Sequence, residues 1–266
     1  DISFLTSIVL DNNFIEDFIY NTGGKFSDHC GLILKLTYLS MQNNDLIDLQ
    51  YLCKSLTHLN LSNNRRLKER WLKNQAELYK LSNLQILKFE GNNVKNFSDS
   101  IFGAMGNLRE VYLAGNYLTV ISTHLFRHNI HLEVIDLQFN LIQQMKAEHL
   151  SHLSSLQKLN LKDNLITSLD LDLLTFFKQT SSLMEIVLTN NYFSCGCEDQ
   201  HTQSFIRETE KVPNSRLLEC SRATEGHEGE TVVAYKRNTF QCDYREIIVI
   251  VSSIIGGFLI TAIIVR

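Results

Sequence analysis

One spacing of apolar and polar residues recurs along much of the chain. Apolar residues stand at the first, fourth and sixth places of a nine-residue unit, and asparagine stands at the ninth. The unit fits eight times, and its asparagines are Asn13, Asn44, Asn64, Asn92, Asn116, Asn140, Asn164 and Asn191. Successive asparagines lie 20 to 31 residues apart. Such a period predicts a repeat array, in which each unit buries its apolar side against its neighbours.

The unit L-x-x-L-x-L-x-x-N is the leucine-rich repeat, and it predicts an α/β solenoid. Each L-x-L piece predicts a short strand, and stacked strands form a parallel sheet on the concave side of a horseshoe. An asparagine amide has donors and an acceptor, so we expect the asparagine ladder to be buried and to pair with backbone groups of adjacent coils. We therefore assign these asparagines to the scaffold. Residues 1–193 are predicted to form eight repeats of an array that begins before Asp1.

The first repeat is long and contains a turn-rich stretch at residues 20–25. We expect this stretch to loop out of the array. Two interpretations stay open, a neutral insertion and a contact for a ligand or partner, because loops on rigid scaffolds often carry function.

A group of cysteines follows the last repeat. Cys195 and Cys197 form a C-x-C pair, and Cys220 and Cys242 follow at a distance. A bond within the C-x-C pair would close a strained ring, so each member is expected to bond one of the distant cysteines, in either arrangement. Two such bridges would staple a cap, residues 194–246, onto the end of the array. The spacing is poor for the competing zinc site.

Two further cysteines lie among the early repeats. Cys30 and Cys53 stand at related places ahead of the second and third strands. They either form a disulfide between consecutive coils or remain buried thiols.

The segment 247–265 has nineteen residues without a charge. This length crosses the hydrocarbon layer of a membrane, so we predict that residues 247–266 are a transmembrane helix cut short on its cytoplasmic side. The disulfide-bearing side is then extracellular or luminal. Small residues spaced four apart, Ser252 with Gly256 and Ser253 with Gly257, either pair two such helices or are ordinary for a span.

Together these features resemble the membrane-proximal end of a Toll-like receptor ectodomain. The resemblance covers the whole chain and rests on the repeats, on the span five residues after the last cysteine, and on the cap residues Cys195-Gly196-Cys197-Glu198, Cys220 and Cys242. It implies the pairings Cys195 to Cys220 and Cys197 to Cys242, and it places Phe205 in the core of the cap. A tryptophan that the family often has after this aromatic residue is missing.

The resemblance also implies a function in innate immune signalling. A single-pass type I receptor at the plasma membrane or in endosomes would bind a microbial or host-derived ligand. It would then form a homo- or heterodimer with a receptor of the same family and recruit cytoplasmic adaptors through a domain beyond Arg266. A leucine-rich-repeat adhesion or matrix-organising protein is the alternative, and an accessory protein without a signalling tail is a third possibility.

Composition and charge add few constraints on function. With 44% hydrophobic and 20% charged residues, the chain has the composition of a folded protein. A formal net charge of -4 gives no global reason to expect nucleic acid or an anionic membrane surface as a partner. The sequence has no phosphate-binding loop, metal motif or nucleophile beside a base, so we expect no cofactor and no enzymatic activity within this chain.

Two weaker signals concern the surface. The sequons begin at Asn60, on the concave sheet, and at Asn96, on a more accessible turn that makes it the better glycosylation candidate. Five of the nine histidines fall within two neighbouring repeats, namely His124, His128, His131, His149 and His152. They are either endosomal pH sensors or, as we favour, ordinary exposed residues of the convex side.

Overall fold

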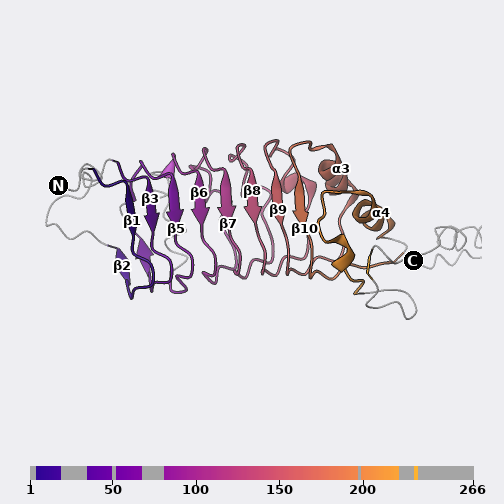
Figure 1. The fold of residues 1–266 in the computed structure, drawn as a ribbon, viewed down its shortest axis with the longest axis horizontal. Helices are drawn as coiled ribbons and strands as arrows, with labels where there is room; N and C mark the ends of the chain where they lie inside the picture. The colour runs from indigo at the N-terminus through magenta and orange to yellow at the C-terminus, as the bar shows by residue number, and fades with distance from the viewer. Residues whose placement is uncertain are drawn as a thin grey trace, which may run out of the picture.

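The computed structural model describes residues 4–18, 35–49, 52–67, 81–196, 199–221 and 231–232. Each of the eight repeats contributes one strand to a single parallel sheet (Figure 1). The strands in spatial order are β1 (Ser7–Val9), β3 (Tyr38–Ser40), β5 (His58–Asn60), β6 (Ile86–Lys88), β7 (Glu110–Tyr112), β8 (Val134–Asp136), β9 (Lys158–Asn160) and β10 (Glu185–Val187). Spatial order follows chain order, which confirms the predicted solenoid.

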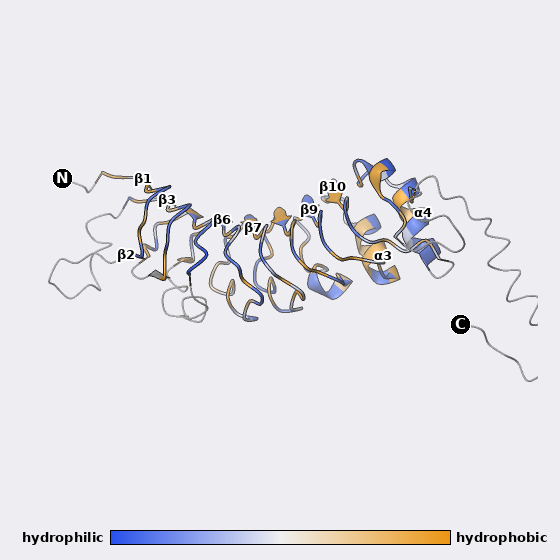
Figure 2. Cartoon of the chain, turned by 90° about the horizontal axis from the view of Figure 1, so that it is seen from below, coloured by the Kyte–Doolittle hydropathy of each residue, from blue (hydrophilic) through white to orange (hydrophobic). Residues whose placement is uncertain are grey.

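The register of the sheet aligns the fourth place of every repeat. Ile8 lies beside Leu39, and the row continues across the sheet to Leu159 and Ile186. The strands line the inner side of an arc, while α3 (Leu171–Gln179) lies on its outer side (Figure 2). The third and fifth places of each repeat therefore face outward from the concave sheet.

A second, two-stranded parallel sheet was not predicted. It joins β2 (Asp17–Phe18) to β4 (Asp48–Leu49) in the first two repeats. The pattern of these repeats does not mark it, because a pair of two-residue strands has no measurable alternation of apolar and polar residues.

The core is a continuous column of apolar side chains between the sheet and the outer turns. Leucines of the first and sixth places, such as Leu108, Leu137 and Leu161, are fully buried. Phenylalanines fill the outer part of the column, and the rings of Phe102 and Phe126 stack with 5.7 Å between centroids. Burial on this scale is the main stabilising contribution to the fold.

The asparagine ladder runs beside this column and links consecutive coils. Asn116 shows the arrangement: its Nδ2 donates to the carbonyl oxygens of Phe89 and Leu113, each at 3.0 Å. Its Oδ1 accepts from the backbone nitrogen of Val94 at 3.0 Å. The six asparagines from Asn44 to Asn164 are buried, and Asn191 is half-buried. Each of them satisfies backbone groups that stacking would otherwise leave without a partner.

Asn13 departs from the prediction that every ladder asparagine is buried. Its side chain is exposed, and its Nδ2 donates only to Leu10 and Asp11, within its own coil. The physical reason is that no described residue stacks on the outer side of this first coil.

An outer row of residues at the eighth place has left-handed backbone. Asn12, Asn43, Asn63 and Asn190 have φ between 55° and 60°, a region that asparagine and glycine tolerate best. Asn63 Nδ2 donates to Asn43 Oδ1 at 2.8 Å, which continues the row from coil to coil. At Gly91 a Cβ would lie 2.1 Å from Asn63 Oδ1, so the row allows no side chain there.

The end of the array is covered by two helices. Asp170 caps α3 by accepting from the backbone nitrogen of Leu173 at 2.7 Å. The second helix, α4 (Gln200–Glu208), belongs to the predicted cap and is followed by the short 3-10 helix η5 (Ser215–Leu217). A further 3-10 turn, η3 (Ala147–His149), lies on the outer side of the sixth repeat.

Candidate functional site

A disulfide closes the predicted cap directly after the last repeat. Cys195 and Cys220 are bonded with 5.6 Å between their Cα atoms, and both are buried. This is the pairing that the family resemblance implies. Cys197 and Cys242, which the resemblance also pairs, lie outside the described residues.

The other cysteine prediction is described in part. Cys53 is disulfide-bonded and buried, so it is not a free thiol. Cys30 lies outside the described residues, as does the turn-rich stretch 20–25. Among the residues that the structure describes, no three histidine, cysteine or carboxylate side chains are grouped so that they could hold a metal ion.

The cap closes the last apolar layer of the array. Phe205 of α4 is fully buried, and its ring centroid lies 5.9 Å from that of Phe177 in α3. The backbone nitrogen of Ile186 in β10 donates to the carbonyl oxygen of Lys211 at 2.7 Å. The cap backbone at Lys211 thus covers the edge of the sheet beside β10. Phe205 therefore has the core position that the resemblance assigns to it.

Lys211 also ties the cap to α3. Its ammonium donates to the carbonyl oxygens of Phe177 and Thr180, both at 2.7 Å, at the carboxyl end of the helix. A cation is favourable there because it meets the unpaired carbonyls and the negative end of the helix dipole. Burial lowers the pKa of Lys211 below its ordinary value.

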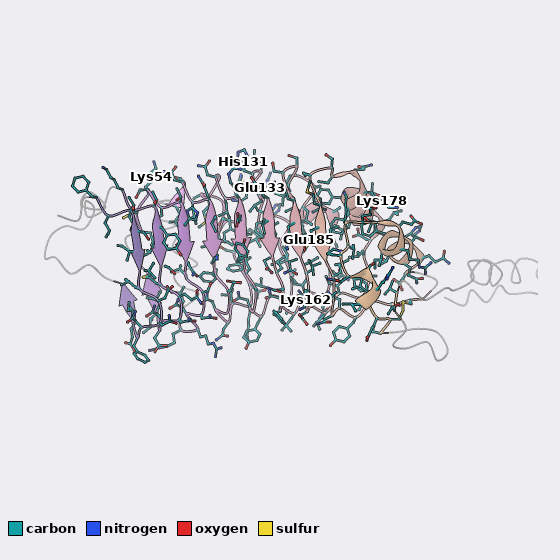
Figure 3. The ribbon with its side chains drawn as sticks, in the orientation of Figure 1. Lys54, His131, Glu133, Lys162, Lys178 and Glu185 are labelled. Carbon is teal, nitrogen blue, oxygen red and sulfur yellow. A yellow bond between two sulfur atoms is a disulfide. The ribbon has the colours of Figure 1, made fainter. Side chains whose placement is uncertain are left out.

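The concave face carries charges of both signs, and two ion pairs lie on it or at its edge. Lys158 Nζ lies 2.8 Å from Glu185 Oε2. Arg109 forms an ion pair with Glu133. Glu185 lies over the sheet, whereas Glu133 lies near the edge where the strands begin (Figure 3). Because charges of both signs are interspersed, the described part of this face has no continuous basic stripe.

A cluster of acidic side chains at the middle of the concave face has raised pKa values. Burial raises the pKa of Asp136, and hydrogen bonds from Gln138 and Asn160 partly oppose the shift. Burial also raises the pKa of Glu90, and the charge of Asp136 raises it further. Tyr112 lies in this cluster. Its pKa is raised mainly by burial and further by the hydrogen bond that its hydroxyl donates to Glu110. Such a patch can offer hydrogen bonds to a polar partner.

The two sequons have different environments. Asn60 is half-buried, and its Nδ2 donates to Gln42 Oε1 at 3.0 Å while its Oδ1 accepts from Ser62. Asn96 is exposed and its side chain makes no hydrogen bond within the described residues. Asn96 is therefore the more accessible of the two acceptors.

The interpretation of all five clustered histidines as exposed is wrong for His149. This residue is 7% exposed, and its Nδ1 accepts from the backbone nitrogen of Lys146 at 2.9 Å. Burial lowers its pKa. His152 is half-buried with Nε2 3.0 Å from the carbonyl oxygen of Phe126, whereas His131 is exposed on the edge where strands begin (Figure 3). The burial of His149 follows from its place in η3, which turns inward against α3.

Aromatic residues along the edge where strands end were missed in the sequence. Tyr117 and Tyr192 occupy the tenth place of their repeats and are 48% and 54% exposed. Phe139 occupies the eighth place with φ of 53° and lies under the ammonium of Lys162. A signal for the two tyrosines was available in the sequence, because the tenth place of the last four repeats holds a large apolar or aromatic residue. Only the structure shows that these tyrosines face solvent.

No described helix has the length and apolar character needed to cross a membrane. The predicted span, with Ser252, Ser253, Gly256 and Gly257, lies outside the described residues.

Comparisons with known proteins agree with the repeat architecture. Residues 106–166 and 130–180 match the family described as Leucine rich repeat. No curated protein sequence matches the chain. The crystal structure of human 5T4, also named Wnt-activated inhibitory factor 1 or trophoblast glycoprotein, is similar with a TM-score of 0.71 and 19% sequence identity. That similarity covers 88% of this chain and 85% of the 5T4 chain, and at this identity it shows the shared fold alone. The chain thus has the leucine-rich-repeat fold, a parallel-sheet solenoid with a disulfide in its C-terminal region, and its residues 106–180 match the Leucine rich repeat family.

Proposed function

We propose that the chain is the ligand-binding and membrane-spanning part of a Toll-type receptor in innate immune signalling. In this proposal the repeats and cap lie outside the cell or in the endosomal lumen. A microbial or host-derived ligand brings two receptors together, and cytoplasmic domains beyond Arg266 recruit adaptors.

The observation that carries the proposal is the order and close spacing of the last repeat, the cap cysteines and the apolar segment. The C-x-C pair directly follows the last repeat, and Cys195 bonds Cys220, the third cysteine of the cap. The segment 247–265 begins five residues after Cys242. In adhesion proteins built from the same repeats, further modules often separate cap and membrane. Here only residues 243–246 separate them. This close coupling suits a receptor that transmits the position of its cap to the other side of the membrane.

The chain acts by binding in this proposal. Its strand residues offer an extended outward surface on a rigid scaffold, which is how repeat solenoids engage partners. The shared fold does not itself distinguish a receptor from an adhesion or matrix-organising protein, because one fold supports several functions. The experiments below therefore also test for an adhesion or matrix-organising protein.

Two measurements test the proposal. The coding sequence beyond Arg266 is expected to contain a globular domain of about 150 residues, a usual domain size. A short tail with no such domain would contradict signalling.

The second measurement detects ligand-driven association. Cells carry the chain fused after Arg266 to complementary luciferase fragments, and candidate lipid, protein and nucleic-acid ligands are screened at neutral and acidic pH. A receptor is expected to give luminescence that rises with one ligand class. An adhesion protein would instead aggregate the cells without such a rise, and that result would favour the alternative.

A further inference from the structure

A pocket of about 470 Å³ lies on the edge where the strands end, between the sixth to eighth repeats and the cap. Its volume falls within the range of small-molecule sites, roughly 300 to 1,000 Å³. The residues that line it are Gln143, Gln144, Leu165, Thr167, Tyr192 and Ser221. It belongs neither to the concave sheet nor to the apolar core.

The frame of the pocket is held by backbone hydrogen bonds between coils. The backbone nitrogen of Leu165 donates to the carbonyl oxygen of Ile142 at 2.9 Å. The backbone nitrogen of Tyr192 donates to the carbonyl oxygen of Ile166, also at 2.9 Å. Ser221 of the cap donates through its hydroxyl to the carbonyl oxygen of Tyr192 at 2.6 Å. These bonds fix the positions of the lining residues, and they also consume the backbone donors that an added peptide strand would need.

The side chains that face the pocket keep their hydrogen-bonding capacity. Gln143, Gln144 and Thr167 are exposed, and their side chains make no hydrogen bond within the described residues. The two amides and the hydroxyl together offer both donors and acceptors. Tyr192, 54% exposed, adds an aromatic ring beside them.

The charge of the lining limits the ligand class. Among the residues that the structure describes, no lysine, arginine, histidine or carboxylate lines the pocket. A charged ligand would lose hydration there without gaining an opposite charge, which is costly. A purely apolar ligand would leave the amides unsatisfied. A neutral sugar fits both requirements, because its hydroxyl groups donate and accept while its C–H face can lie on an aromatic ring.

We propose that this pocket binds a neutral saccharide unit, with its C–H face on Tyr192 and its hydroxyl groups bonded to Gln143, Gln144 and Thr167. The proposal does not depend on the receptor function above, since a sugar site at this edge would serve an adhesion protein equally well.

The test uses the full chain in a detergent that has no sugar headgroup. Soluble oligosaccharides of glucose, mannose, galactose and N-acetylglucosamine are the probes, and saturation-transfer NMR detects their bound ring protons. We expect one class to receive saturation. Removing one aromatic contact should weaken its affinity by about five-fold. The expected loss therefore appears in Tyr192→Ala and not in Tyr117→Ala, which removes a similarly exposed tyrosine from the tenth place of a repeat outside the pocket.

Further variants and probes keep the result interpretable. If Tyr192→Ala does not fold, Gln143→Ala and Gln144→Ala carry the test, because both side chains are exposed and unbonded. A sialylated probe is expected to bind more weakly than its neutral parent. The proposal is overturned if no saccharide receives saturation, if Tyr117→Ala weakens binding as much as Tyr192→Ala, or if the anionic probe binds as well as the neutral one.

Discussion

The two ends of the array carry the same repeat but differ in how well they bury it. In the last coil Leu183, at the first place, is 1% exposed, and Leu188, at the sixth place, is fully buried. In the first coil Leu5 is 38% exposed and Leu10 is only half-buried. The last coil has the cap against its outer side, and the first has no described residue there. The difference shows that the repeat supplies apolar residues, whereas the neighbouring layer supplies their burial.

The largest difference between the ends is expected from leucine substitutions at the sixth place. Leu188→Ala removes a fully buried side chain and should lower the free energy of unfolding by about 2–5 kcal/mol. Leu10→Ala should lower it by less than about 1 kcal/mol, because much of that side chain already contacts water. Urea denaturation followed by circular dichroism measures both. Equal losses would mean that the first coil is buried in solution.

The disulfide of the capped end should have the next largest effect. Replacing Cys195 and Cys220 together by alanine opens a loop with a sequence separation of 25 residues. The expected loss of unfolding free energy is about 3 kcal/mol, and it should be accompanied by faster proteolysis around α4. Protease cleavage mapped by mass spectrometry locates the loss. Cleavage that instead spreads evenly along the repeats would show that the bond does not act through the cap.

Ladder asparagines sharpen the comparison at a smaller scale. Asn164 donates to Leu137 of the preceding coil at 2.9 Å and accepts from Ile142, so Asn164→Ala leaves buried backbone groups unpaired. We expect a loss of about 1–3 kcal/mol. Asn13→Ala removes an exposed amide that bonds only within its own coil and should have almost no effect. The account fails here if the two variants unfold at the same urea concentration.

The smallest predicted effect concerns pH and the middle of the concave face. A carboxyl whose pKa is raised in the folded state binds its proton more tightly there than in the unfolded chain. Glu90 should therefore stabilise the fold less as the pH rises from its ordinary pKa through its raised one. Glu90→Gln is expected to reduce this decline, and Asp99→Asn, an exposed carboxylate, serves as the control. Unfolding midpoints between pH 4 and 7 test the difference, and a decline that is unchanged in Glu90→Gln would contradict it.

The repeat pattern was sufficient to predict the sheet, because its period is long and its leucines face inward in every coil. It predicted the ladder for the same reason, apart from Asn13, whose burial depends on a neighbour rather than on its own repeat. The burial of His149 could not be predicted, since the outer side of each coil follows no strict pattern. The pocket beside Tyr192 was equally hidden, because its residues come from three repeats and the cap.

Hydrogen exchange of the strand amides tests most directly the claim that neighbouring layers determine the burial of each coil. Mass spectrometry on the full chain would compare β1 with β7, β8, β9 and β10. The account predicts that β1 exchanges fastest and that the strands from β7 to β10 are strongly protected, with β10 losing protection when Cys195 and Cys220 are both replaced by alanine. Equal protection of β1 and β9, or a β10 unaffected by loss of the disulfide, would contradict it.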